Sequence, residues 1–242
     1  MKRIIAVQAR MTSSRLPGKV LLDVAGRPML AQQLRRLKQC REAEDIVIAT
    51  TVNPADDPLA ELARKEGVGV VRGSESDVLE RFLRLTRETK ADVVVRITAD
   101  CPLICPDETD RVITALTGEL DYAANVLQRT YPRGLDTEAM HADVVERMNR
   151  LAHSEFAREH VTTFIRLEQP QLFRCCSVVD ESGNNSDLRW TVDVPEDLRL
   201  VRALYQALNL GTQFVGYRDI LAYVRAHPEL SQLNAHVAQK LT

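Results

Sequence analysis

Short runs of β-branched residues alternate with amphipathic segments through the first hundred residues, and this alternation restricts the fold more than any other feature. The apolar runs are RIIAVQA (3–9), DIVIATT (45–51), VGVVRG (68–73) and DVVVRIT (92–98). Between them, residues 26–40, 56–66 and 76–90 repeat apolar side chains at helical spacing. Parallel strands need crossover helices, which cover both faces of the sheet. The pattern therefore predicts an α/β doubly wound, mostly parallel sheet.

The alternation loosens after about residue 125. A helical stretch, SEFAREHVTTFIRLEQ (154–169), and mixed polarity before it predict an inserted lobe at about 125–175 that serves substrate binding or dimerisation. The strands FRCCSVV (173–179) and LRWTVDV (188–194), followed by the helix 195–209 and further helices over 217–241, return to the main pattern. We expect a single domain over residues 1–242.

The composition argues against several classes of function. Lys and Arg number 32 and Asp and Glu 34, a formal net charge of −2, which does not suit a protein that holds long nucleic acid by neutralising phosphates. No apolar run approaches the roughly 18 residues of a membrane span, and the run after Met1 is too short for a signal peptide. Five cysteines without a paired framework fit a reducing compartment, and Cys101 and Cys105 lack the second Cys/His pair of a zinc site. The prediction is a soluble, cytoplasmic protein.

The segment QARMTSSRLPGKVL (8–21) follows the first strand directly and carries three cations. In open α/β sheets ligands bind where strands end, so this loop is the expected ligand site. It is neither a Walker loop nor a dinucleotide fingerprint, because it lacks their glycines and the Ser or Thr after the lysine. Guanidinium, ammonium and hydroxyl donors suit a triphosphate, with a solvated surface loop as the alternative. The donors are Arg10, Ser13, Ser14, Arg15 and Lys19.

Two aspartates follow predicted strands at the same edge of the sheet. Asp100 follows DVVVRIT, and Asp193 lies at the end of LRWTVDV, before a helix start whose Glu196 and Asp197 are ordinary first-turn acids. A strand-end aspartate can simply end its strand, but Mg²⁺ in nucleotide sites is typically held by one or two carboxylates and by phosphate oxygens. Two such residues opposite a cationic loop favour magnesium-dependent nucleotidyl transfer.

Five motifs together resemble the spore coat polysaccharide biosynthesis protein F family, which is similar to the CMP-sugar cytidylyltransferases for acylneuraminate and 3-deoxy-manno-octulosonate. They occur in the expected order over most of the chain. The motifs are A-R-x-x-S-x-R-L-P-G-K (9–19), R-I-T-A-D-C-P-L (96–103), P-R-G-L-D-T-E (132–138), R-E-H-V-T (158–162) and R-W-T-V-D-x-P-E-D-L (189–198).

The resemblance implies a cytidylyltransferase that joins CMP from CTP to an acidic, nonulosonate-like sugar, with release of pyrophosphate, for surface polysaccharide synthesis. By this resemblance Arg10 and Lys19, with Ser14 and Arg15 beside them, bind the triphosphate, and Asp100 and Asp193 hold Mg²⁺; Arg10, Lys19 and Asp100 are then catalytic. It also implies a homodimer paired through the 125–175 lobe. Thr98 and Ala99 stand where the octulosonate branch has Gln and Gly, so we expect different contacts to the base.

Residues 72–82 (RGSESDVLERF) open a helix at the same sheet edge. Arg72, Ser74 and Asp77 are candidates for contact with the ribose or base of the nucleotide. The alternative is structural, with Ser74 or Ser76 as the N-cap of the helix.

The candidate acceptor contacts lie in the predicted lobe. Arg133, on a Pro-Arg-Gly turn, is a candidate to hold the substrate's carboxylate or phosphonate, and Asp136 and Glu138 to accept sugar hydroxyls. The alternative is a surface salt bridge between Arg133 and Glu138. Arg158 is a candidate second anion contact; His160 is a further candidate, although Phe156 and Phe164 on its helical face favour a packed histidine.

Three other functions are weighed against this one. A cytidylyltransferase for a phosphonate or polyol phosphate would use the same cleft. A sugar-1-phosphate pyrophosphorylase would need a glycine-rich first loop, which is missing. A catalytically inactive nucleotide-binding module would be expected to lack Asp100 or Asp193, and both are present.

Overall fold

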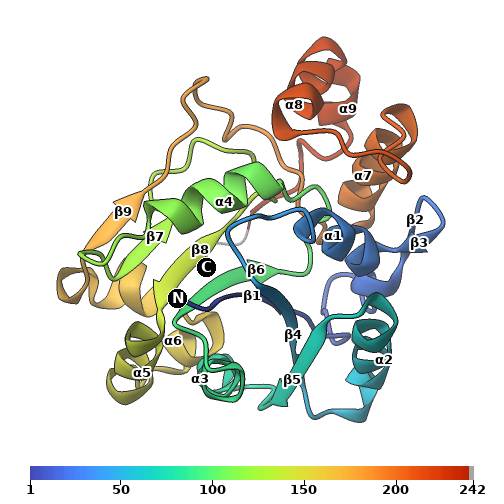
Figure 1. The fold of residues 1–242 in the computed structure, drawn as a ribbon. Helices are drawn as coiled ribbons and strands as arrows, with labels where there is room; N and C mark the ends of the chain where they lie inside the picture. The colour runs from blue at the N-terminus through green and yellow to red at the C-terminus, as the bar shows by residue number, and fades with distance from the viewer. Residues whose placement is uncertain (240–242) are drawn as a thin grey trace.

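A seven-stranded sheet lies at the centre of the computed structural model, which describes residues 1–239 (Figure 1). The strand order is β5-β4-β1-β6-β8-β7-β9. The strands of this sheet are β1 (Arg3–Gln8), β4 (Asp45–Thr51), β5 (Gly69–Gly73), β6 (Val93–Thr98), β7 (Tyr122–Ala124), β8 (Glu138–His141) and β9 (Cys175–Ser177). A separate hairpin is formed by β2 (Asp23–Val24) and β3 (Arg27–Pro28).

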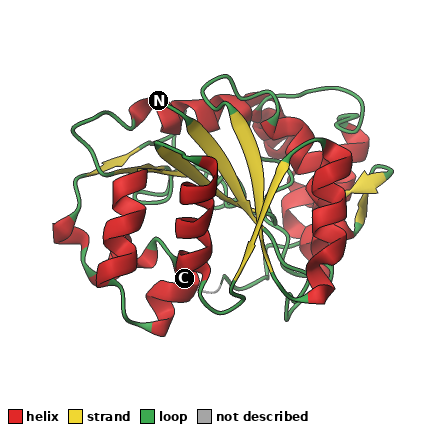
Figure 2. Cartoon of the chain, turned by 60° about the horizontal axis from the view of Figure 1, so that its bottom comes forward, coloured by secondary structure: helices red, strands yellow, loops and turns green. Residues whose placement is uncertain are grey.

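Helices cover both faces of the sheet, as Figure 2 shows. They are α1 (Met29–Leu37), α2 (Asp57–Glu66), α3 (Val78–Thr89), α4 (Pro106–Ala115), α5 (Ala142–Leu151), α6 (Glu155–His160), α7 (Pro195–Ala207), α8 (Tyr217–Ala226) and α9 (Pro228–Gln232). Short helical turns are η1 (Lys19–Leu21), η2 (Pro54–Asp56), the π-helical η3 (Phe164–Glu168) and η4 (Pro170–Leu172). None of the helices within 1–239 has the length and apolarity that crossing a bilayer requires.

The predicted α/β architecture is confirmed. The four strands β5, β4, β1 and β6 are parallel, and β1 pairs with β4 on one side and β6 on the other. Buried Ile and Val side chains of these strands fill an apolar layer on each face of the sheet. Because β1 and β6 are adjacent and parallel, the loops that follow them leave the sheet at the same edge.

The segment predicted as an inserted lobe is partly built into the main body. Its strand β8 is antiparallel to both β6 and β7 and lies inside the sheet. Its helices α5 and α6 pack on α3 beneath the sheet. The helix predicted over 154–169 is interrupted at Val161, whose φ of 56° ends α6, and η3 follows after a short gap.

The segment 188–194, predicted as a strand, forms no strand in the structure. Its one β-bridge joins Arg189 to Arg133, and the segment runs in extended form toward α7. Trp190 and Val192 are nevertheless buried in a third apolar cluster, beneath α7 and α8. Alternating apolar residues thus pack against helices here rather than against a neighbouring strand, so Asp193 is not at a strand end.

Candidate active site

A cleft of about 820 Å³ opens at the edge of the sheet where β1 and β6 end. Gln239 borders the cleft, and six segments form its walls: the loop after β1, the end of β6 with the residues after it, the region 126–138, α6, η3, and the extended segment before α7. From the first two and the last of these come Arg10, Ser13, Ser14, Arg15, Lys19, Thr98, Asp100, Thr191 and Asp193.

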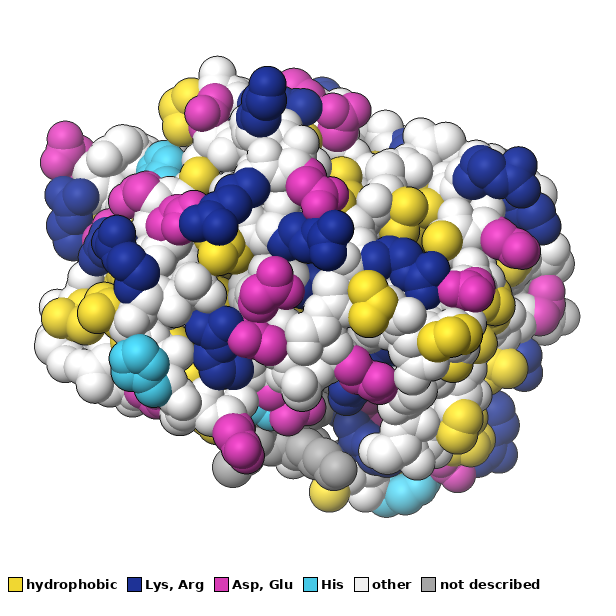
Figure 3. Space-filling view, turned by 90° about the horizontal axis from the view of Figure 1, so that it is seen from below, with side chains coloured by type: hydrophobic (Ala, Val, Ile, Leu, Met, Phe, Trp, Pro, Cys, Tyr) yellow, Lys and Arg dark blue, Asp and Glu magenta, His cyan; other side chains and the backbone are white. Residues whose placement is uncertain are grey.

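The surface in Figure 3 carries charged side chains of both signs, which are interspersed. This face therefore has no continuous basic surface of the kind that binds a nucleic acid backbone.

Lys19 joins three of these segments. Its Nζ donates to Asp100 Oδ2 at 3.1 Å, to Asp193 Oδ1 at 2.9 Å and to the Val192 carbonyl at 2.7 Å. The turn that places it begins at Gly18, whose φ of 68° favours glycine. Burial lowers the pKa of Lys19, but attraction to Asp100 and Asp193 outweighs it, so the pKa is raised above its ordinary value. The ammonium group is therefore charged at neutral pH.

Asp100 is fixed by the end of β6. Thr98 Oγ1 donates to Asp100 Oδ1 at 2.6 Å, and the Asp100 carbonyl accepts from the Val192 backbone N–H at 2.8 Å. Burial raises the pKa of the carboxyl group, whereas Lys19 and the Thr98 hydroxyl lower it by a larger amount, so the pKa is below its usual range. This carboxylate is ionised at neutral pH and tied to the segment that carries Asp193.

Asp193 has three cationic neighbours. Besides Lys19, Arg15 Nη2 lies 2.9 Å and Arg189 Nη2 2.8 Å from Asp193 Oδ2. The backbone N–H of Asp193 donates to Asp197 Oδ2 at 2.8 Å. The loop after β1 and the start of α7 thus both contact Asp193. The sequence predicted Asp193 at the site, but at the end of a strand that is not formed.

The two carboxylates fit the requirements of a magnesium ion. Asp100 and Asp193 already share one cation, the Lys19 ammonium, and their side chains keep 23% and 13% of their surface exposed toward the cleft. Within residues 1–239 no cluster of three or more His, Cys, Asp or Glu side chains could hold a metal. A site built from two carboxylates, with phosphate and water completing the shell, is the arrangement that Mg²⁺ takes beside nucleotides.

Contacts with two other segments fix the cationic loop beside the cleft. Its Met11 backbone N–H donates to Asp56 Oδ1 at 2.7 Å, and Arg10 Nη2 lies 3.8 Å from Glu159 Oε1 of α6. Ser13 and Ser14 line the cleft beside Arg10. The structure thus brings together all the residues predicted for the triphosphate, since Arg15 and Lys19 lie deeper in the same wall.

The residues predicted for ribose or base lie outside the cleft lining. Arg72 donates to the Thr51 carbonyl at 2.7 Å and pairs with Asp57 at 2.7 Å. Asp77 is the N-cap of α3, accepting from the Glu80 backbone N–H at 2.9 Å, so the predicted cap at Ser74 or Ser76 is wrong. Ser74 Oγ instead accepts from the Asp77 backbone N–H at 3.0 Å. Ser74 and Asp77 thus stabilise the β5–α3 connection, whereas Arg72 ties β5 to the segment between β4 and α2.

Glu138 borders the cleft, but its carboxylate is engaged by neighbouring side chains. It is 3% exposed; Arg96 donates to it, Arg166 Nε lies 3.8 Å away, and Tyr122 Oη donates to Oε1 at 2.5 Å. Burial raises the pKa of Glu138, but Arg96 and Arg166 lower this pKa by a larger amount, so the carboxylate stays charged. This cluster replaces the alternative salt bridge to Arg133, and the contact with a sugar hydroxyl stays a prediction, since Glu138 borders the cleft.

Asp136 and Arg133 lie on either side of Gly134, at the end of the cleft where the sequence predicts the acceptor contacts, here named the acceptor end. Both oxygens of Asp136 accept from Arg129, at 2.7 and 2.8 Å. Arg133 lines the cleft, and among the described residues its guanidinium has no ion-pair partner. Burial lowers the pKa of Arg133, and the neighbouring Arg129 adds to that effect. A cation in this setting gains most from an anionic ligand.

The two α6 candidates have different surroundings. Arg158 Nε donates to both oxygens of Asp77, at 2.9 and 3.0 Å, and Arg158 Nη1 to Asn149, so this residue faces α3 and is not an anion contact in the cleft. His160 lines the cleft with its ring against the Phe156 ring, at 4.8 Å between centroids. Burial lowers the pKa of His160, as do nearby arginines, so the ring is neutral at pH 7.

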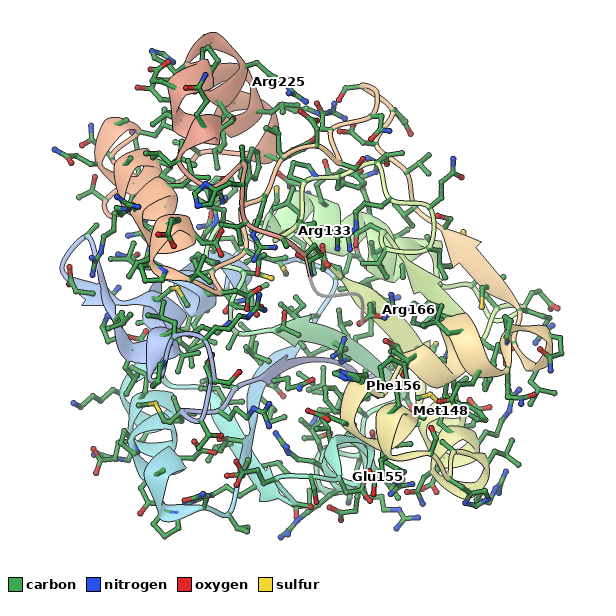
Figure 4. The ribbon with its side chains drawn as sticks, turned by 180° about the vertical axis from the view of Figure 1, so that it is seen from behind. Arg133, Met148, Glu155, Phe156, Arg166 and Arg225 are labelled. Carbon is green, nitrogen blue, oxygen red and sulfur yellow. The ribbon has the colours of Figure 1, made fainter. Side chains whose placement is uncertain are left out.

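Several cleft residues were not predicted from the sequence. Arg96, Arg129 and Arg166 line the acceptor side, and Figure 4 shows Arg133, Arg166 and Phe156 approaching it from different elements. Arg96 carried a usable signal, because a charged residue inside the apolar run DVVVRIT needs a buried partner. Arg166 and Phe156 carried none, since each fits an ordinary amphipathic helix.

Comparison with known proteins gives concordant results. Residues 4–216 match the family model described as cytidylyltransferase. The spore coat polysaccharide biosynthesis protein SpsF of Bacillus subtilis strain 168 is 33% identical over 209 residues, covering 84% of this chain and 86% of SpsF. The predicted resemblance to the spore coat polysaccharide protein F family is therefore confirmed.

Solved structures agree with the fold. A cytidylyltransferase from Leptospira borgpetersenii serovar Hardjo-bovis superposes with a TM-score of 0.90 at 30% identity, covering 100% of this chain and 99% of that one. The CMP:2-keto-3-deoxy-manno-octonic acid synthetase in complex with CTP superposes with a TM-score of 0.62 at 21% identity, covering 86% of this chain and 100% of that one. At the lower identity the likeness concerns the fold alone.

Proposed function

The chain belongs to the cytidylyltransferase family, and from this premise we propose that it transfers CMP from CTP to an acidic, nonulosonate-like sugar, with release of pyrophosphate. The proposal goes beyond the family in naming the acceptor and the products. The charges that line the two ends of the cleft support it.

The triphosphate end is cationic at several depths. Arg10, Ser13 and Ser14 lie at the outer loop, and Arg15 and Lys19 lie next to the carboxylate pair. Guanidinium groups bind phosphate oxygens in pairs, and the ammonium of Lys19 adds a compact charge. This graded arrangement orients a nucleoside triphosphate with its phosphates over Asp100 and Asp193.

The reaction is an in-line displacement at the α-phosphorus. The acceptor hydroxyl oxygen forms the new O–P bond, the bond from the α-phosphorus to the bridging oxygen breaks, and pyrophosphate leaves with the electron pair while the hydroxyl proton passes to water. Asp100 and Asp193 would hold Mg²⁺, which supplies charge neutralisation at the phosphates when bound. Lys19 and Arg15 stabilise the negative charge that develops, and positioning supplies much of the rate.

The acceptor end selects an anion. Arg133 lies in the cleft without a carboxylate partner among residues 1–239, whereas Arg96 and Arg129 are neutralised by Glu138 and Asp136. A substrate carboxylate at Arg133 would fix the sugar so that its hydroxyl faces the phosphates. His160 and Phe156 border the same end and would contact the body of the sugar.

The single observation that carries this proposal is the Lys19 ammonium between Asp100 and Asp193 at the foot of the cationic loop. It joins a phosphate-binding cation to two carboxylates at one point, as nucleotidyl transfer requires. A pyrophosphate-release assay tests it, with Mg²⁺, each of CTP, UTP, GTP and ATP, and a panel of nonulosonic acids, simple phosphonates and polyol phosphates.

We expect turnover with CTP and an acidic sugar, and its loss in Asp100→Asn. If only a polyol phosphate or a phosphonate is turned over, the proposed acceptor is wrong, but the proposed transfer of CMP from CTP stands. CTP that neither binds nor reacts would refute the proposal.

A further inference from the structure

Asp193 lies on no strand of the sheet: the neighbouring Val192 N–H donates to the Asp100 carbonyl at 2.8 Å, and the contacts of Asp193 itself are with side chains. Asp100 directly follows β6, which is hydrogen-bonded to β1 along its length. The segment around Asp193 has a single β-bridge, between Arg133 and Arg189. A carboxylate that binds a metal in a fixed geometry needs neighbouring groups that hydrogen-bond to the carboxylate and orient it. For Asp193 these partners must come from neighbouring side chains.

Arg189 and Asp197 form the first layer of that support. Arg189 Nη2 donates to Asp193 Oδ2 at 2.8 Å, and Arg189 Nε donates to Asp197 Oδ1 at 2.9 Å. Asp197 is fully buried, and its Oδ2 accepts from the Asp193 backbone N–H at 2.8 Å. Both the main chain and the side chain of Asp193 are thus held by this pair.

Asn234 lies behind the pair and bonds to both of its members. It follows α9, is 3% exposed, and its Nδ2 donates to the Arg189 carbonyl at 2.9 Å and to Asp197 Oδ1 at 2.8 Å. Farther along, Gln239 accepts from Arg189 Nη1 and lines the cleft. Two residues of the segment 233–239 thus contact Arg189, Asn234 at its backbone carbonyl and Gln239 at its guanidinium. These residues lie outside the range 4–216 that the family model matches.

We propose that Asn234 is a positioning residue for the Asp193 carboxylate, acting through Arg189 and Asp197, and that Gln239 restrains the same arginine from the cleft side. The inference rests on the proposed function, in which Asp193 holds the metal. Without the Asn234 amide, Arg189 and Asp197 lose a shared donor, so the Asp193 carboxylate is held less firmly on the Arg189 side while Lys19 and Arg15 still contact it.

The test measures metal binding separately from catalysis. Mn²⁺ is titrated into the full chain by electron paramagnetic resonance in the presence of CTP and with no acceptor, and CTP binding is measured in EDTA. The variant is Asn234→Ala. The matched control is Asn185→Ala, which removes a buried amide from a network with Asp180 and Tyr217 that is not part of the cleft lining. Unfolding midpoints are recorded first, so that all titrations are made on folded protein.

We expect Asn234→Ala to weaken Mn²⁺ binding by about tenfold while CTP binding in EDTA is unchanged. Asn185→Ala should change neither, whatever it does to the midpoint. Gln239→Ala, at a half-buried position, should lower Mn²⁺ affinity by less than Asn234→Ala does. Wild-type Mn²⁺ affinity in Asn234→Ala, or equal losses in both asparagine variants, would overturn the positioning role.

Asp193→Asn separates this failure from failure of the proposed function. If Asp193→Asn binds Mn²⁺ as tightly as wild type, Asp193 is not a metal ligand and the premise itself is wrong. If Asp193→Asn loses the metal and Asn234→Ala does not, the premise stands and only the inference about Asn234 falls.

Discussion

Replacing Lys19 by methionine removes the ammonium group between Asp100 and Asp193 and keeps a side chain of similar reach. The Lys19 side chain is 10% exposed, and its Nζ lies 3.1 and 2.9 Å from the two carboxylates. Removing one partner of a buried ion pair costs about 3–5 kcal/mol, because the remaining charge is left unpaired. Arg15 and Arg189 still neutralise Asp193, and Asp100 is partly exposed, so we expect about 2–4 kcal/mol.

Scanning calorimetry measures this loss. For a chain of this size 1 kcal/mol shifts the unfolding midpoint by about 2–4 °C, so the midpoint of Lys19→Met should fall by roughly 5–15 °C. The matched control is Lys38→Met, because the Lys38 side chain is 39% exposed and its ion pair with Glu66 is 3.4 Å long. A surface pair of that kind contributes about 0–1 kcal/mol.

Added Mg²⁺ and turnover complete the test. With the ammonium gone, Asp100 and Asp193 can take Mg²⁺ without CTP, so the metal should raise the midpoint of Lys19→Met more than that of wild type. Turnover should fall by about 10²–10³, the usual cost of losing one donor to a developing negative charge. If Lys19→Met has the wild-type unfolding midpoint and keeps full turnover, Lys19 neither stabilises the fold through the two carboxylates nor assists the reaction.

Three further predictions concern the acceptor end and pH. Glu138→Gln should lower the free energy of unfolding by about 3–5 kcal/mol in calorimetry, because Arg96 and Arg166 lose their buried counter-charge. An unchanged midpoint with a raised acceptor KM would instead show that Glu138 contacts the sugar. Arg133→Met should raise the acceptor KM by about 10–100-fold and leave the KM for CTP unchanged, since a hydrogen bond to a charged group is worth about 1.5–3 kcal/mol; equal rises in both KM values would contradict it. The pKa of Asp100 is lowered by folding from about 3.9, so its stabilising contribution is complete above that pH and is lost as pH falls through the folded value; chemical denaturation from pH 5 downward should show a shallower loss in Asp100→Asn than in wild type.

The regular elements near the start of the chain were predictable because their causes are local. The runs DIVIATT and DVVVRIT became β4 and β6, and the apolar periodicity of 76–90 became α3. Helix and strand follow from the spacing of apolar residues within one segment, and the loop after β1 then lies at the ligand edge of a parallel sheet. Arg10, Arg15, Lys19 and Asp100 could be placed at the site on that ground alone.

The fate of the other charged residues depended on which elements meet. Glu138 was predicted as a ligand contact and borders the cleft, but its carboxylate is engaged by Arg96 of β6, Arg166 of η3 and Tyr122 of β7, which are distant in sequence. Arg158 could equally have faced the cleft, yet Asp77 of α3 takes its guanidinium.

By itself, then, the sequence determined the α/β sheet, the cationic loop and the first aspartate, whereas the tertiary structure decided which charges remain open to a ligand. The physical reason is that a buried charge must find a partner wherever packing brings one. That choice left Arg133 available and placed Asp193 on a network of side chains that reaches Asn234.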